Sequence, residues 1–131
     1  MRITAALMLV LVAAFVAPAF GQSFVGQWTA TSHTPSGDVS ETLTVVKTGN
    51  GYTITAGEPV GVPEGSPKAG PGTDIVVDGD KFSYKRTVAT PDYTIVITYT
   101  GTVSGDTFTG TANLGGFADA PYTGVRIKQR D

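Results

Sequence analysis

Few residues of this chain have side chains that could carry chemistry. There is one histidine, His33, and there are no cysteines, so disulfides, thiolate catalysis and cysteine-based metal sites are excluded. His33 has no second histidine or glutamate at a spacing that holds a transition metal. A Ser–His–Asp site could recruit it, but a lone outward-facing histidine is more often simply hydrated. We therefore assign no catalytic residue, no metal site and no cofactor, and leave enzymatic activity open.

Glu41 and Arg86 are the most informative polar residues, because each interrupts a run of apolar residues at alternate positions. Burying a charge is costly unless it is paired. Two interpretations remain open. In the first, the two side chains form an ion pair inside the fold and anchor a polar ligand group together with Tyr84, Tyr93 and Tyr122. In the second, both reach the rim of the fold and are hydrated.

Two glycine-containing segments resemble known sites but are explained by turn chemistry. Asp78-Gly79-Asp80 offers too few ligands for Ca²⁺. Gly65-Ser66-Pro67-Lys68 is not a phosphate-binding loop, because prolines remove amides there and no helix is expected to follow. The stretch 57–72 around it is unusually long for a loop. It is either a lid over a binding site or an insertion without function.

The elements that must position these residues are strands. From Phe24 onward the apolar residues recur with a period of two, most clearly over 93–103, where odd positions are mostly large and apolar and even positions are mostly threonine. This alternation places one face of a sheet on a core and the other in water. We expect an all-β domain with eight strands, at 24–33, 38–47, 52–56, 73–78, 81–89, 93–104, 106–114 and 121–128.

The turns between these strands fall into two classes. Gly49-Asn50, Gly79-Asp80 and Gly105-Asp106 each precede an x-aromatic-Ser/Thr sequence, and Gly with Asn or Asp is typical of tight hairpins. They are the second, fourth and sixth connections, so in an up-and-down meander they share one end, the floor. The looser connections at 34–38, 57–72, 90–92 and 115–121 share the other end, the mouth. Closing the sheet into a barrel removes its edges.

The first 21 residues have the pattern of a secretory signal peptide. Arg2 supplies a positive charge, residues 3–16 form an uncharged, mostly apolar run, and Ala19-Phe20-Gly21 offers small residues for cleavage. The run is too short to span a bilayer, which takes about 20 apolar residues. We expect a signal peptide over 1–21, a single barrel domain over 22–131, and a periplasmic or secreted protein.

Composition and charge exclude two classes of partner. The formal net charge is −2, and no cluster of Lys and Arg occurs, so we expect no nucleic-acid binding. An outer-membrane barrel would present an apolar outer face, whereas the alternate face here is rich in threonine and carries Lys85. We therefore expect no membrane insertion of the mature chain.

Two short motifs resemble a known family. Gly26-Gln27-Trp28 in the first strand matches the G-x-W element of the calycins, the lipocalin-like barrels, and Arg126 in the last strand matches the basic residue that this family packs over its tryptophan. The resemblance implies an eight-stranded barrel whose floor is closed by Gly26, Trp28 and Arg126. The chain departs from typical lipocalins because it has no cysteines for their disulfide and no flanking helix is expected.

The resemblance does not predict one activity, because such barrels include carriers, inhibitors and a few enzymes. The first expectation is an exported barrel that binds a small, largely apolar ligand at its mouth. The alternative is a protein-binding or inhibitor barrel that acts on an exported partner. A third is an enzyme with a site near Glu41 and Arg86.

Overall fold

The computed structural model describes residues 24–63 and 65–128. They contain eight strands, each within two residues of the expected bounds: β1 (Gly26–Thr34), β2 (Gly37–Thr48), β3 (Gly51–Ala56), β4 (Thr73–Asp78), β5 (Lys81–Ala89), β6 (Thr94–Ser104), β7 (Thr107–Leu114) and β8 (Asp119–Arg126). The predicted signal peptide and its cleavage site lie outside the described residues.

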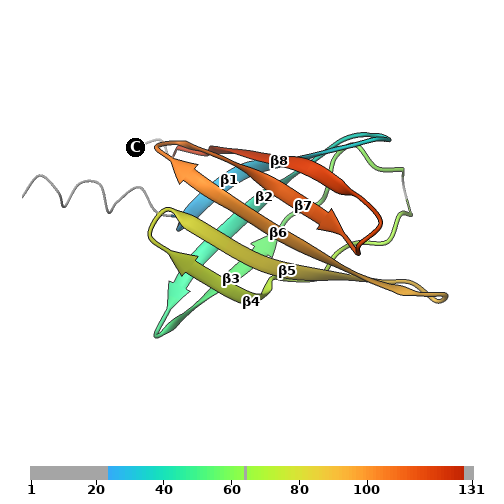
Figure 1. Cartoon of the computed structure of the whole chain (residues 1–131), viewed down its shortest axis with the longest axis horizontal. Coiled ribbons are helices and arrows are strands. Elements are labelled where there is room, and N and C mark those ends of the chain that lie inside the picture. The colour runs from blue at the N-terminus through green and yellow to red at the C-terminus, as the bar shows by residue number, and fades with distance from the viewer. Residues whose placement is uncertain (1–23, 64, 129–131) are drawn as a thin grey trace, which may run out of the picture.

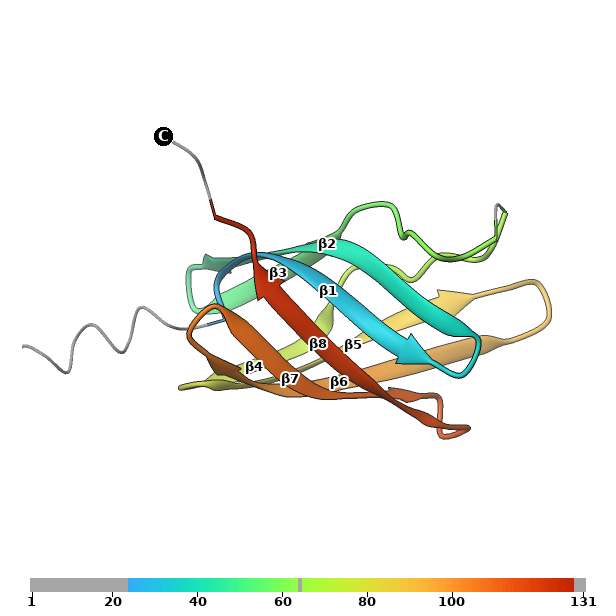
Figure 2. The same ribbon diagram turned by 90° about the horizontal axis from the view of Figure 1, so that it is seen from above.

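The strands form one antiparallel sheet that curls into a nearly closed barrel (Figures 1 and 2). Their order is β3-β2-β1-β8-β7-β6-β5-β4, so the first and last strands of the chain are hydrogen-bonded neighbours. The sheet has one seam, between β3 and β4. There the N–H of Gly72 donates to the carbonyl of Ile54 at 2.9 Å. The all-β meander expected from the sequence is confirmed.

The two ends of the barrel differ as the order of connections predicts. Figure 1 shows the turns β2–β3, β4–β5 and β6–β7 at the end where β1 begins, and the other four connections at the opposite end. The longest of these is the loop from 57 to 72, between β3 and β4. All three turns at the first end have two residues; at the opposite end only the β1–β2 turn is that short, contrary to the looser connection expected there. The floor and the mouth are therefore opposite ends of the barrel.

Trp28 and Arg126 close the floor together, as expected from the motifs. They are register partners on β1 and β8, and the guanidinium carbon lies 4.3 Å from the centroid of the fully buried indole. Arg126 also donates to the carbonyl of Val25 at 2.9 Å. Gly26 has a φ of +133°, and a Cβ there would lie 2.9 Å from Arg126 Nη1. The glycine of the G-x-W element is thus required by its backbone conformation, and it also leaves room for the Arg126 side chain.

Aromatic rings fill the interior above this floor. The lower set stacks Phe24 on Phe82 at 3.8 Å between centroids and sets Phe108 edge-on to Trp28 at 5.0 Å. Above it, Tyr84 stacks on Tyr99 at 4.6 Å. All of these rings are at most 4% exposed. The lower half of the barrel is thus occupied by side chains of the chain itself.

A repeated aromatic-Thr-Gly triplet makes this packing possible. It occurs at Tyr99–Gly101, Phe108–Gly110 and Tyr122–Gly124, on the neighbouring strands β6, β7 and β8. The aromatic residue is buried, the threonine lies on the other face of the sheet, and the glycine leaves inward space. A Cβ on Gly124 would lie 2.1 Å from Phe108 Cε2, and one on Gly110 would lie 1.8 Å from the carbonyl oxygen of Thr100.

Gly110→Ala should therefore destabilise the barrel, because its Cβ would overlap a backbone atom that no rotamer change can move. We expect the free energy of unfolding in urea to fall by about 2–3 kcal/mol, the upper range for overpacking. The matched control is Gly51→Ala, which has no heavy atom within 4 Å of the new Cβ and no positive φ. Equal effects of the two substitutions would contradict this account of the triplet.

Candidate functional site

Glu41 and Arg86 form an ion pair in the mouth half of the barrel. They come from β2 and β5, and Arg86 Nη1 donates to Glu41 Oε2. The side chains are only 14% and 5% exposed. Burial alone would lower the pKa of Arg86, but attraction to Glu41 and Tyr99 and the hydrogen bond to Glu41 outweigh this effect and raise it. Of the two interpretations left open by the sequence, the geometry agrees with the buried ion pair.

The loop 57–72 is fastened to the sheet on both sides of this pair. Its first limb pairs with β2 through two hydrogen bonds between Val60 and Ser40, of 2.7 and 2.9 Å. Its second limb pairs with β5 through the N–H of Gly70, which donates to the carbonyl of Thr87 at 2.9 Å. The two limbs thus continue the edges of the sheet where β3 has ended and β4 has not begun.

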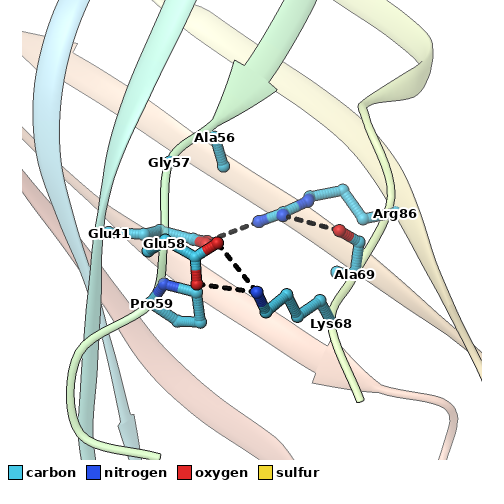
Figure 3. A pocket seen from close by; sticks show the side chains of 8 residues that line it. All are labelled: Glu41, Ala56, Gly57, Glu58, Pro59, Lys68, Ala69 and Arg86. Atoms are coloured by element: carbon cyan, nitrogen blue, oxygen red, sulfur yellow. Dashed lines mark hydrogen bonds and ion pairs between the residues drawn. The ribbon is translucent and has the colours of Figure 1, made fainter. Parts of the chain in front are cut away.

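Arg86 ties the second limb to the barrel. Its Nε donates to the carbonyl of Gly70 at 2.7 Å, and Nη2 donates to that of Ala69 at 3.2 Å. A second, solvent-exposed ion pair joins the two limbs to each other. Lys68 Nζ in the second limb lies 2.7 and 2.8 Å from the two carboxylate oxygens of Glu58 in the first. We call the Arg86–Glu41 and Lys68–Glu58 pairs, with the two carbonyls, the clasp. Figure 3 shows the two ion pairs and the contact with Ala69.

A pocket of about 290 Å³ opens at the clasp. Its lining combines both ion pairs with small loop residues: Glu41, Ala56, Gly57, Glu58, Pro59, Lys68, Ala69 and Arg86 (Figure 3). Each positive side chain faces a negative one. The pocket is therefore polar and internally neutralised, which suits water or a small polar molecule better than an apolar one.

Beneath the clasp lie three buried tyrosines, Tyr84, Tyr99 and Tyr122. The hydroxyl oxygens of Tyr84 and Tyr122 are 2.5 Å apart. Burial raises the pKa of all three phenols, and for Tyr84 the charge and hydrogen bond of Tyr122 raise it further. These phenols therefore remain protonated and act as fixed hydrogen-bonding groups below Arg86.

The structure brings together four of the five residues proposed as a mouth site: Glu41, Tyr84, Arg86 and Tyr122. The fifth, Tyr93, lies in the β5–β6 connection and is 56% exposed. Of the five, only Glu41 and Arg86 line the pocket itself. Sequence reasoning missed Tyr99, although its inward position follows from the alternation in β6. It also missed Glu58 and Lys68, for which the sequence holds no signal because their meeting depends on the path of the loop.

His33 takes part in a hydrogen-bonded row on the outer face of the sheet. Its Nδ1 lies 3.0 Å from Asp38 Oδ1, and its Nε2 lies 3.0 Å from Thr123 Oγ1. The connectivity is that of a hydrolytic triad. However, Thr123 lies in β8 between Thr31 and Thr109, where strand N–H groups bond to neighbouring strands and none is free to stabilise an oxyanion. The row is therefore best explained as a cross-strand structural contact.

Comparisons with models of protein families, with curated proteins and with solved structures found no match. Within residues 24–63 and 65–128, no three His, Asp or Glu side chains gather closely enough to hold a metal ion. The same part of the chain contains no helix long and apolar enough to cross a membrane. The likeness to calycins thus stands on the eight-stranded barrel and the Trp28–Arg126 contact alone.

Removing one partner of the buried Glu41–Arg86 pair should destabilise the protein strongly. Glu41→Gln leaves the buried Arg86 charge without its carboxylate, and we expect a loss of about 3–5 kcal/mol in the free energy of unfolding. Glu58→Gln, in the exposed pair with Lys68, should cost at most about 1 kcal/mol. Urea unfolding of both variants provides the test. A loss below that of Glu58→Gln would mean that the buried pair does not fasten the loop.

The buried phenols predict a loss of stability at alkaline pH. An unfolded tyrosine titrates near pH 10, so above about this pH the unfolded chain releases protons that the folded chain retains, and the free energy of unfolding falls. Urea unfolding between about pH 8 and pH 11 should show this fall. A Tyr84→Phe/Tyr122→Phe variant should show a shallower one, and an equally steep fall would assign the effect to other groups.

Proposed function

We propose that this barrel binds another protein through the connections at its mouth. The observation that carries the proposal is where the connections expose apolar side chains. Phe117, Val60 and Tyr93 are 82%, 70% and 56% exposed, and all three lie in mouth connections. The floor turns consist of glycine, asparagine and aspartate. Single valines on the outer face of the sheet are exposed as well, such as Val76 at 57% and Val125 at 58%. Among the described connections, however, only those at the mouth expose large apolar side chains, and such groups in loops are typical of an interaction surface.

The two exposed rings belong to connections that are held in shape. In the β7–β8 connection, the N–H of Phe117 donates to the carbonyl of Leu114 at 3.0 Å, and Leu114 donates to Ala118 at 2.8 Å. In the β5–β6 connection, the N–H of Tyr93 donates to Thr90 Oγ1 at 3.0 Å. Connections fixed in this way lose little entropy on binding. The rings are therefore presented to solvent by local hydrogen bonds, which suits contact with a partner.

The filled interior weighs against a small apolar ligand deep in the barrel, because an eight-stranded barrel has room for either side chains or one small ligand. A small-ligand carrier remains the second candidate, for one reason. The inward positions nearest the mouth, Val39, Val88 and Ile95, are only half-buried. Together these side chains offer a shallow apolar surface above the clasp, where a small apolar ligand at the mouth would bind.

Membership of the calycin group and export are part of the same proposal. The G-x-W element with its arginine supports the first, because the contact links the first and last strands as in that family. The charged, apolar and small-residue segments of 1–21 support the second. A periplasmic or secreted barrel would meet exported proteins, and both calycin carriers and calycin inhibitors fit such a location.

Site-specific photo-crosslinking in the source cells tests the proposal. A photoreactive phenylalanine at position 117 or 93 should yield one discrete protein adduct, and the same group at Asn50 in the floor turn should not. With the partner purified, Phe117→Ser should weaken binding by about 30-fold or more, the effect of losing an aromatic anchor of roughly 2 kcal/mol.

Native mass spectrometry of the protein from the same cells separates the two candidates. A stable protein complex, with a mature chain that begins at Gln22, is the expected result. A small molecule bound in a one-to-one ratio, without any adduct from the mouth positions, would overturn the protein-binding proposal in favour of the carrier.

A further inference from the structure

We infer that the partner segment docking at the mouth carries a basic side chain next to an apolar one; this inference rests on the proposed function. It starts from a juxtaposition found in two connections. The β5–β6 connection presents Asp92 beside Tyr93, and the β7–β8 connection presents Phe117 two residues before Asp119. The β5–β6 connection therefore offers one exposed aromatic ring and one exposed carboxylate, and the β7–β8 connection does so together with Asp119, the first residue of β8.

The two connections lie at the ends of neighbouring strands. β6 pairs with β7 from Ile97 to Ser104, so the β5–β6 hairpin extends past the last β7 pair. Gly115 in the β7–β8 connection approaches Ile95 in this extension of β6. The position of a Cβ on Gly115 is 2.8 Å from Ile95 Cγ2 and 3.6 Å from Phe117 Cδ2. Ile95 is thus the apolar link between the two connections. We call Asp92, Tyr93, Ile95, Phe117 and Asp119 the mouth rim.

Within the described part of the chain, the carboxylates of the mouth rim have no cationic partner. Among the described residues, neither Asp92 nor Asp119 forms an ion pair, and Asp119 only accepts a hydrogen bond from Asn113 Nδ2 at 2.7 Å. The cations nearest this end, Lys68 and Arg86, are already engaged in the clasp. The mouth rim therefore has uncompensated negative charge beside apolar surface.

The floor end lacks this imbalance. Its acidic residues are accompanied by at least as many basic ones: Asp78, Asp80 and Asp106 against Lys47, Lys81, Arg126 and Lys128. Asp106 is bonded to both Arg126 and Lys128. The negative field is thus a property of the mouth rather than of the whole surface, although the net charge of the chain is only −2.

Charge complementarity selects the occupant. A lysine or arginine can lay its aliphatic stem and its charge against an aromatic ring while its head group reaches a carboxylate. An acidic segment would meet repulsion at both aspartates, which disfavours wrong partners and slows their association. A polypeptide that alternates basic and apolar side chains is therefore the chemistry that the mouth rim fits.

Three short synthetic peptides serve as probes in an NMR titration of the ¹⁵N-labelled mature protein. They are Lys-Phe-Lys-Phe-Lys, its acidic counterpart Glu-Phe-Glu-Phe-Glu, and Lys-Ser-Lys-Ser-Lys, which keeps the charge and lacks the rings. The first should shift the amide signals of 90–95 and 115–119 and leave the floor turns unchanged. The second and third should bind at least about tenfold more weakly, since each lacks one of the two complementary features.

Two charge-matched variants supply the control. Asp92→Asn/Asp119→Asn should weaken binding of the Lys-Phe peptide about tenfold, as two exposed ion pairs permit. Asp78→Asn/Asp80→Asn changes the net charge equally, but at the floor. It should weaken peptide binding less than about twofold, because the attraction between such distant exposed charges is largely screened by salt. All four side chains are on the surface, so both variants are expected to fold.

The outcomes separate this inference from the proposed function. Selective binding of the Lys-Phe peptide that depends on Asp92 and Asp119 supports it. Equal binding of the acidic peptide at the same amides would overturn the charge rule and leave a protein-docking mouth in place. An equal loss in the two variants would reduce the effect to non-specific attraction. If no peptide shifts the mouth amides, both this inference and protein docking at the mouth rim are wrong.

Discussion

Aromatic rings fill the narrow interior of this eight-stranded barrel. They fit only where residues on the facing strands have no side chain. The aromatic-Thr-Gly triplets meet this constraint on three adjacent strands, where glycines at inward positions accommodate Phe82, Phe108 and the close approach of β6 to β7. Because interiors are close-packed, volume given to rings is not available to a ligand. A binding surface is therefore expected at the mouth rather than in the lower half of the barrel.

The seam between β3 and β4 is where closure of the sheet is incomplete, and it explains the buried ion pair. Beyond Leu43 on β2 and Lys85 on β5 the edge strands no longer provide partners. The limbs of the loop 57–72 take their place, and Arg86 bonds to both Glu41 and the loop carbonyls. An arginine suits this position because its planar group donates in several directions at once. The pair therefore has a structural role, whether or not a ligand also uses the pocket beside it.

The difference between the two ends of the barrel links fold to function. At the floor, the turns have two residues each and Arg126 covers Trp28, so this end presents little apolar surface to a partner. At the mouth, short hydrogen-bonded connections hold Tyr93 and Phe117 in solvent. A rigid scaffold that positions variable loops at one end is a common arrangement for recognition. Here the exposed aromatic rings of those loops distinguish them from the turns opposite, which consist of glycine, asparagine and aspartate.

The sequence by itself determined the strands, their meander order, and which connections share an end. Alternation is a local property, and turn order alone fixes the parity of the ends. It also determined that Trp28 and Arg126 become neighbours, because a closed meander brings its first and last strands together.

Only the tertiary structure decided how the mouth residues meet. The sequence identified Glu41 and Arg86 but left open whether they pair or are hydrated, because the answer depends on where β3 ends and on the path of sixteen loop residues. It grouped Tyr93 with the inward tyrosines, whereas the hydrogen bonds of Thr90 place that residue in a turn and its ring is exposed. Local periodicity specifies the face on which a strand residue lies. Contacts across a seam or within a loop depend on backbone geometry accumulated over distant segments, and no local pattern encodes that geometry.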